Sequence, residues 1–175
     1  MIVSKYELGD VRSQANLIDQ TIALRFGTYD LLHAGHKAGI ADAAQQADLL
    51  VVGVMPDEYV SRVKGPSRPI NPEQRRIQAI DEAEGVDFSF IAPPRALGMA
   101  RAILSLRPNT YIEDEEQEAG RLRSLFLGVL GTEYVTVPRN EGGSTTEMIN
   151  LLGLEEAIRC SSLDFALRQP APEVS

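Results

Sequence analysis

A segment near the start of the chain combines the side-chain types that could hold a phosphate group. It runs from Gly27 to His36, reads GTYDLLHAGH, and contains the only two histidines of the 175 residues. A spacing of three residues at a helix start sets the rings of His33 and His36 toward one side. Gly27 and Gly35 lack the Cβ atoms that would block a close ligand. Because free amides at a helix N-terminus attract phosphate oxygens, the segment predicts an anion site.

A histidine pair could instead belong to a zinc site, or could occur by chance. Zinc needs further ligands, yet the chain has no third histidine and its single cysteine, Cys160, is distant in sequence. Cys160 cannot form an internal disulfide, and we interpret it as a small buried residue in a reducing compartment. Chance does not readily explain two histidines, two glycines and Asp30 within ten residues of a predicted strand. We therefore predict phosphate binding and no metal-binding residues.

Alternating strands and helices must position this segment. Apolar and β-branched runs predict strands at residues 21–26, 48–54, 86–92, 110–113 and 134–137. Predicted helices lie around residues 40–44, 56–63, 71 onward, 97–106, 115–130, 144–152 and 155–167. This order predicts an α/β fold, a Rossmann-like doubly wound parallel five-stranded sheet with helices on both faces. Ligands of such sheets bind at the carboxyl ends of the strands, where the winding reverses.

The predicted domain covers residues 21–153. Residues 1–20 are expected to form an N-terminal arm or short helix, and residues 154–175 a C-terminal helix with a frayed tail. Two helix starts carry capping signals. In the first, Asn71 is the expected N-cap, Pro72 the N1 residue and Gln74 the N3 residue, and in the second Ser144 opens a capping box.

Composition excludes several classes of protein. Of the residues, 43% are apolar and 24% charged, which is typical of a globular chain. Seventeen basic against twenty-five acidic residues leave a net charge of −8, so general affinity for nucleic acid is not expected. The most apolar stretch, residues 49–55, is too short to cross a bilayer, and we expect a cytoplasmic protein with no membrane span. Any anion must be held by a local cluster of donors.

Three segments together resemble a known family. The segment from Gly27 to His36 matches the nucleotidyltransferase signature of cytidylyltransferase-like proteins completely. Residues 139–149, RNEGGSTTEMI, are similar to the late motif of that family. Lys64-Gly65 and the stretch from Arg68 to Arg75 resemble the loop and helix that carry its conserved lysine and arginine. The resemblance covers about residues 22–152.

The resemblance implies a reaction and a set of site residues. In the family, an alcohol phosphate attacks the α-phosphorus of a nucleoside triphosphate and pyrophosphate leaves, without a covalent intermediate. Such transfer is catalysed mainly by positioning and by donors that stabilise negative charge. The implied catalytic residues are His33, His36, Lys64 and Arg139. The implied nucleotide-binding residues are Gly27, Thr28, Tyr29, Asp30, Gly35, Ser144, Thr145 and Thr146.

The resemblance also assigns an acceptor residue and a metal. Arg75 would bind the acceptor phosphate, although Arg76 beside it could take that role or both could face water. Asp30 is expected to orient the loop, or to hold a cation through water. Magnesium is expected with the triphosphate, held mainly by the oxygens of the substrate.

The choice of nucleotide stays open in the sequence. Residues 139–146 resemble glycerol-3-phosphate and phosphoethanolamine cytidylyltransferases, which favours CTP as the donor of a CMP moiety to a phosphorylated small alcohol. Residues 68–74 resemble heptose-phosphate adenylyltransferases, so the alternative is ATP with a sugar phosphate or FMN. A non-catalytic nucleotide-binding module is a third interpretation. Similar proteins often form homodimers.

One stretch departs from the family pattern. Many cytidylyltransferases carry a Gly-Asp-Asp turn after the fourth strand, whereas this chain has the acidic run from Glu113 to Glu118. We interpret the run as a solvated helix N-terminus, where acidic side chains suit the helix dipole. Alternatively, it alters the acceptor site, because unpaired carboxylates would repel a phosphate.

Overall fold

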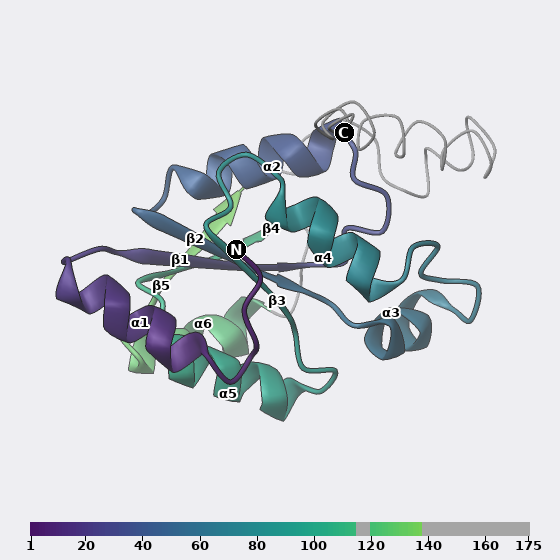
Figure 1. The fold of residues 1–175 in the computed structure, drawn as a ribbon. Helices are drawn as coiled ribbons and strands as arrows, with labels where there is room; N and C mark the ends of the chain where they lie inside the picture. The colour runs from purple at the N-terminus through teal and green to yellow at the C-terminus, as the bar shows by residue number, and fades with distance from the viewer. Residues whose placement is uncertain (115–119, 138–175) are drawn as a thin grey trace, which may run out of the picture.

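Five parallel strands form one sheet in the computed structural model, which describes residues 1–114 and 120–137 (Figure 1). Their order across the sheet is β3-β2-β1-β4-β5. The strands are β1 (Ile22–Gly27), β2 (Leu49–Val54), β3 (Phe88–Ile91), β4 (Thr110–Asp114) and β5 (Glu133–Val137). The chain builds outward from β1 to β3 and then crosses to the other side of β1. This is the predicted doubly wound α/β sheet, and its winding reverses between β1 and β4.

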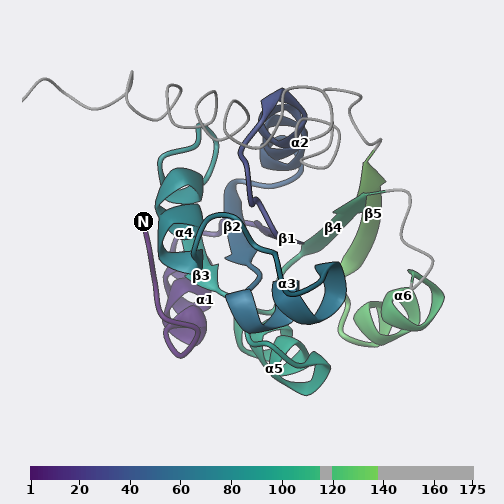
Figure 2. The same ribbon diagram turned by 90° about the vertical axis from the view of Figure 1, so that its right-hand side faces the viewer.

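Two helices cover one face of the sheet. Figure 2 shows α2 (Ala34–Ala44) and α4 (Glu73–Asp81) on the same side. Ile40 of α2 and Ile80 of α4 are buried against the strand residues Leu50 and Val52. Burial of apolar surface of this kind is the main force that holds the layers together.

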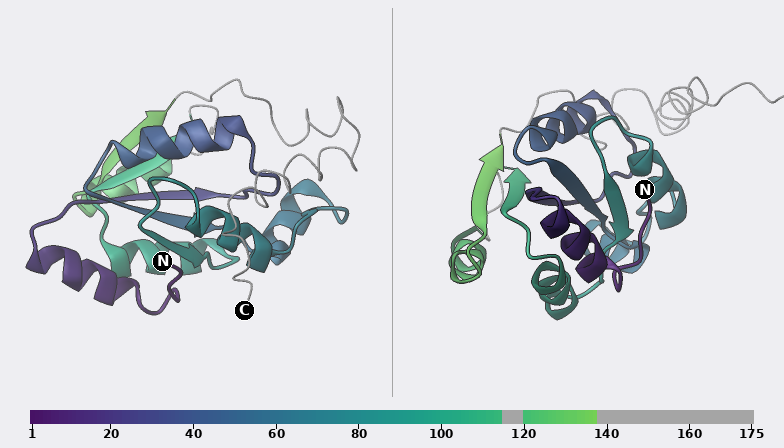
Figure 3. Two further views of the ribbon diagram at one scale, coloured as in Figure 1. Left: turned by 45° about the horizontal axis from the view of Figure 1, so that its top comes forward. Right: turned by 60° about the vertical axis from the view of Figure 1, so that its left-hand side comes forward.

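The other face carries α1 (Leu8–Leu17), α5 (Ala96–Leu106) and α6 (Gly120–Val129). Figure 3 shows α1 beside α5, and these two helices are in contact. Leu8 and Val11 of α1 are buried in the same core as Leu106 of α5 and Leu24 of β1. The short helix expected before the first strand is therefore packed into the molecule.

The register of the strands determines which residues meet at the carboxyl edge. Gly27, the last residue of β1, pairs with Val54 at the end of β2, and Arg25 of β1 pairs with Ile112 of β4. The loop that contains the signature leaves β1 at this edge, and α3 (Asp57–Lys64) follows β2 there. The segments that carry His33 and Lys64 thus leave the sheet at the same edge at which β4 ends.

One prediction about local structure needs correction, and several others lie outside the described residues. The N-cap assigned to Asn71 is wrong: Pro72, with ψ at 154°, is the N-cap, and α4 begins at Glu73. The side chain of Asn71 instead donates a hydrogen bond to the carbonyl oxygen of Asp30. The predicted helices at 144–152 and 155–167, the tail, and residues 115–119 of the helix expected at 115–130 lie outside the described residues. No helix among residues 1–114 and 120–137 is long and apolar enough to span a membrane.

Candidate active site

The two histidines stack on each other at the start of α2. Their ring centroids are 3.8 Å apart and their planes differ by 25°. His33 is the N-cap of α2, with extended backbone, and its Nδ1 accepts a hydrogen bond of 3.3 Å from the backbone N–H of His36. The spacing of three residues therefore brings the rings together, as the sequence predicts, and the first histidine has an additional role as a helix cap.

The hydrogen bonds of the pair fix which nitrogens carry protons. Because Nδ1 of His33 accepts, the ring proton of neutral His33 is on Nε2. Nδ1 of His36 lies 3.1 Å from the carbonyl oxygen of Leu31, so this nitrogen is the donor and Nε2 carries a lone pair when the ring is neutral. His33 is thus a donor as a neutral ring, whereas His36 donates through Nε2 only as an imidazolium.

The surroundings of His36 keep its ring neutral. Burial and, to a smaller extent, the neighbouring His33 lower the pKa of His36 to about 3, against the effect of the Leu31 carbonyl, which raises it. The charges of Arg25 and Lys64 act in the same direction as burial. Two cationic side chains from β1 and α3 are therefore close enough to His36 to influence its protonation.

Tyr29 packs inside the loop between β1 and α2. Its side chain is 3% exposed, and its ring centroid lies 5.3 Å from that of His36 in an edge-to-face contact. A Cβ atom on Gly27 would lie 2.4 Å from the Tyr29 ring, so a glycine is required there for Tyr29 to pack. The structure thus gives Gly27 a reason other than the close approach of a ligand.

Asp30 ties the signature loop to the loop that follows α3. Its carboxylate accepts hydrogen bonds from Nε of Arg68 at 2.7 Å and from the backbone N–H groups of Ile70 and Asn71 at 2.8 and 3.0 Å. The Asp30 side chain is 1% exposed, and that of Arg68 is 13% exposed. Asp30 orients the loop, which is the first of the two roles expected for it.

Arg76 fastens a third segment to these two loops. Its guanidinium donates to the carbonyl oxygens of Asn71 at 2.9 Å and Thr28 at 2.5 Å, and to Oδ1 of Asp57 at 2.7 Å. The Arg76 side chain is completely buried. Arg76 is therefore a structural residue, which leaves Arg75 as the candidate for acceptor binding.

Lys64 and Thr28 lie in segments that these anchors hold. Lys64 is the last residue of α3, is exposed, and acts electrostatically on His36. Gly65 follows with φ at 98°, a conformation that glycine adopts without strain, and it ends the helix. Thr28 belongs to the loop between β1 and α2, where Arg76 holds its carbonyl oxygen. The structure thus brings His33, His36 and Lys64 into one neighbourhood.

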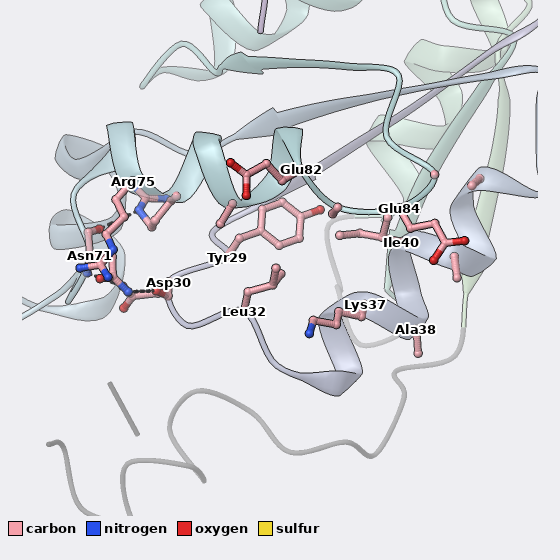
Figure 4. Close-up of a pocket in the computed structure, with 16 residues that line it drawn as sticks. Tyr29, Asp30, Leu32, Lys37, Ala38, Ile40, Asn71, Arg75, Glu82 and Glu84 are labelled. Carbon is pink, nitrogen blue, oxygen red and sulfur yellow. Dashed lines mark hydrogen bonds between the residues drawn. The ribbon is translucent and has the colours of Figure 1, made fainter. Parts of the chain in front are cut away.

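Arg75 lies in a separate pocket between α2 and α4 (Figure 4). The pocket has a volume of about 540 Å³ and an apolar lining that includes Leu32 and Ile40. Lys37 and Arg75 also line it, together with Tyr29 and Asp30 of the signature. His33, His36 and Lys64 are not among the lining residues. The pocket therefore adjoins the signature loop on its α4 side.

The acidic run begins inside the sheet. The interpretation of Glu113 and Asp114 as a solvated helix N-terminus is wrong, because both belong to β4 and their side chains bind partners on opposite faces. Glu113 is 6% exposed and accepts hydrogen bonds from Arg123 and from Tyr134. Asp114 pairs with Arg25 at 2.5 Å. These two carboxylates are neutralised by partners within the protein, and residues 115–118 lie outside the described part.

Of the remaining predicted residues, Gly35 stands in the first turn of α2. Arg139 and the helix start at Ser144, Thr145 and Thr146 lie outside the described residues. Among residues 1–114 and 120–137, no three histidine, cysteine or acidic side chains come together as a metal site. Sequence reasoning missed Arg68 and Arg76 as anchors, and only the acidic residue inside the signature hinted that a buried cation was needed.

The chain matches a protein family over most of its length. The model of the cytidylyltransferase-like family covers residues 24–150, and the chain belongs to this family. The protein named "Bifunctional protein HldE" of Photobacterium profundum is 39% identical over 155 residues, which are 86% of this chain and 32% of that protein. A protein of the same name from Aeromonas hydrophila is 32% identical over the same shares of the two chains. The chain thus spans about a third of these relatives.

Two solved structures share the fold of this chain. A lipopolysaccharide core biosynthesis protein of Thermoplasma volcanium has a TM-score of 0.59 at 23% identity, over 70% of this chain and 99% of that one. A pantoate–β-alanine ligase of Francisella tularensis has a TM-score of 0.62 at 16% identity, over 100% of this chain and 82% of that one. At these identities, the likeness concerns the fold alone. The protein is a nucleotidyltransferase-like member of the cytidylyltransferase-like family.

Proposed function

We propose that the protein transfers the nucleotidyl group of ATP to a phosphorylated sugar and releases pyrophosphate. The observation that carries the proposal is the pairing of His33 and His36 at the start of α2, with Lys64 close enough to act on His36. Donors at a helix N-terminus suit a triphosphate. The complete reaction is part of the proposal, because this chain spans only 32% of the length of the curated relative that it matches.

In the proposed reaction, an oxygen of the acceptor phosphate attacks the α-phosphorus of the nucleotide, and the bond to the leaving pyrophosphate breaks. No residue needs to act as a nucleophile, because the acceptor phosphate is already ionised. Nε2–H of His33 donates to a phosphate oxygen. His36 takes up a proton when the triphosphate binds, since adjacent negative charge favours the imidazolium. Lys64 stabilises charge between the two phosphate groups.

Other residues of the proposed site would bind the substrates without donating hydrogen bonds to the reacting atoms. Thr28 would contact phosphate through its amide and hydroxyl groups, and Arg139 with the helix start at Ser144 would hold the β- and γ-phosphates. Arg75 would bind the acceptor phosphate from the α4 side. Magnesium would arrive with the triphosphate and neutralise part of its charge, held mainly by substrate oxygens.

Two observations favour different nucleotides. The segment from Arg68 to Gln74 resembles heptose-phosphate adenylyltransferases, and its Arg68 and Asn71 bind Asp30 of the signature. This segment supports ATP and a sugar phosphate. The block from Arg139 to Thr146 resembles cytidylyltransferases, and it supports CTP with a phosphorylated alcohol as the second candidate.

A substrate matrix separates the candidates. The protein is incubated with ATP or CTP against a sugar 1-phosphate, glycerol 3-phosphate, phosphoethanolamine or FMN, and pyrophosphate release is measured. The first proposal predicts release with ATP and the sugar phosphate, at least about tenfold faster than with CTP, which corresponds to about 1.4 kcal/mol. Faster release with CTP would replace it by the second candidate. Nucleotide binding without release in any combination would indicate a binding module. The cytoplasmic location and the homodimer expected from the sequence stay predictions.

A further inference from the structure

An ion pair joins the neighbouring strands β1 and β4, between which the winding of the sheet reverses. Arg25 lies on β1, and Asp114 is the last residue of β4. Nη2 of Arg25 donates to Oδ1 of Asp114 over 2.5 Å, and Nη1 donates to the carbonyl oxygen of Gly39 over 2.9 Å. The Arg25 side chain is 8% exposed, and that of Asp114 is 38% exposed. A single guanidinium thus joins β1, β4 and α2, the helix that presents the histidine pair.

The same guanidinium lies next to the residues that surround His36. Burial raises the pKa of Tyr29, and the charge of Arg25 opposes this effect. The ring of Tyr29 in turn contacts the ring of His36 edge to face. Gly39 admits the guanidinium closely, because a Cβ atom there would lie 3.1 Å from Nη2 of Arg25. The ion pair, Tyr29 and His36 therefore lie next to one another, between the sheet and the start of α2.

The energetics of this ion pair point to orientation rather than net stability. Removing the Arg25 charge from water costs free energy that offsets much of its attraction to Asp114, so an apolar pair of similar volume often stabilises a fold as well. An apolar pair, however, fixes no directions. The fork of Arg25 has hydrogen-bond partners on two elements, and each bond restrains the angle of α2 on the sheet.

We propose that Arg25 and Asp114 are positioning residues for the candidate active site, and that their ion pair holds α2 and the ring of His36 in the geometry that binds the triphosphate. The inference rests on the proposed function of His36. It also accounts for the departure from the family pattern at the end of β4. Arg25 neutralises Asp114, so this carboxylate of the acidic run would not repel a phosphate.

The imidazole signals of the protein offer a direct test, because the chain has only two histidines. Nitrogen-detected titrations of both rings are recorded for the wild type, Arg25→Met, Arg25→Lys and Asp114→Asn, and His33→Asn assigns the signals. Arg101→Met is the matched control, because Arg101 is exposed on α5. Pyrophosphate release and KM for the triphosphate are measured on the same samples.

Arg25→Met should raise the pKa of His36 by about one pH unit or more, since a nearby charge is lost and the ring is released into water. Turnover should fall about tenfold with KM changed by less than about threefold, because misplacement affects the transition state more than binding. Arg25→Lys should retain only part of the wild-type turnover, since lysine lacks the forked guanidinium that bonds two partners at once. Arg101→Met should match the wild type in both readouts.

Two outcomes would overturn the inference. One is a His36 titration and turnover in Arg25→Met that equal those of Arg101→Met. If Arg25→Met does not fold, the other is an unchanged titration and turnover in Asp114→Asn, which keeps the shape of the side chain. Failure of the proposed function gives a different result: the wild type would release no pyrophosphate. In that case the His36 titration of Arg25→Met would still test whether Arg25 positions the ring.

Discussion

Replacement of Arg76 by methionine should destabilise the protein far more than the same replacement of its neighbour Arg75. Arg76 is completely buried and donates to two carbonyl oxygens and to Asp57. Breaking a buried ion pair by removing one partner costs about 3–5 kcal/mol. The Asp57 side chain is 40% exposed and can take water in place of the guanidinium, which puts the expected loss near the lower end, at about 3 kcal/mol. Arg75 is exposed, so Arg75→Met should cost less than about 1 kcal/mol.

Urea unfolding followed by circular dichroism measures both free energies. The slope of the free energy with urea should be the same in the two variants, since the surface exposed on unfolding hardly changes. Asp57→Asn should lie between Arg76→Met and the wild type, because an amide oxygen still accepts from Arg76. A loss of less than about 1 kcal/mol in Arg76→Met, or equal losses in the two arginine variants, would refute the assignment of Arg76 as the structural member of the pair.

Three further predictions concern the site. The pKa of His36 is about 3 in the folded protein and about 6.5 in the unfolded chain, so between these pH values the unfolded state binds one more proton than the folded state. The free energy of unfolding should therefore be highest above pH 6.5 and should fall by about 1 kcal/mol per pH unit below about pH 6. Urea unfolding from pH 7 to pH 4 should show a smaller fall in His36→Gln, and identical slopes would contradict a neutral His36. His33→Asn keeps a capping side chain but lacks the ring, so turnover should fall about a hundredfold with the unfolding free energy changed by less than about 1 kcal/mol, and near-normal pyrophosphate release would remove His33 from the reaction. Arg139→Ala should weaken triphosphate binding and leave monophosphate binding almost unchanged in calorimetry, whereas equal losses for both ligands would exclude a role at the β- and γ-phosphates.

The sheet could be predicted because its signals are local. The nearly continuous apolar run at residues 48–54 indicates a strand covered on both faces, and such runs alternate with capped helices along the chain. The histidine pair follows from spacing at a helix start. These features depend on residues that are neighbours along the chain, so they can be predicted from a single sequence.

The anchors of the site could not be predicted because they are long-range pairs of charges. Asp30 meets Arg68 across 38 residues, and Arg25 meets Asp114 across 89. Nothing in a single sequence distinguishes such partners from solvated surface charges. The alternation of faces along β4 could have separated Glu113 from Asp114 if the strand had been extended by one residue. The Asn71 cap failed for a related reason, because a distant carbonyl competes for its side chain.

The loop after α3 is anchored at both ends, and its middle can therefore tolerate changes in sequence and length. Its beginning is fixed by the end of α3 at Lys64, and its far end by the bonds of Arg68 and Asn71 to Asp30, while Pro66 and Ser67 between them are exposed. The free energy needed to close a loop grows slowly with its length, so insertions at Pro66 and Ser67 should leave both attachments intact. Sequence changes in this short stretch should therefore leave the geometry of the histidine pair and the stability of the fold unchanged, and a library restricted to these two positions would test that separation.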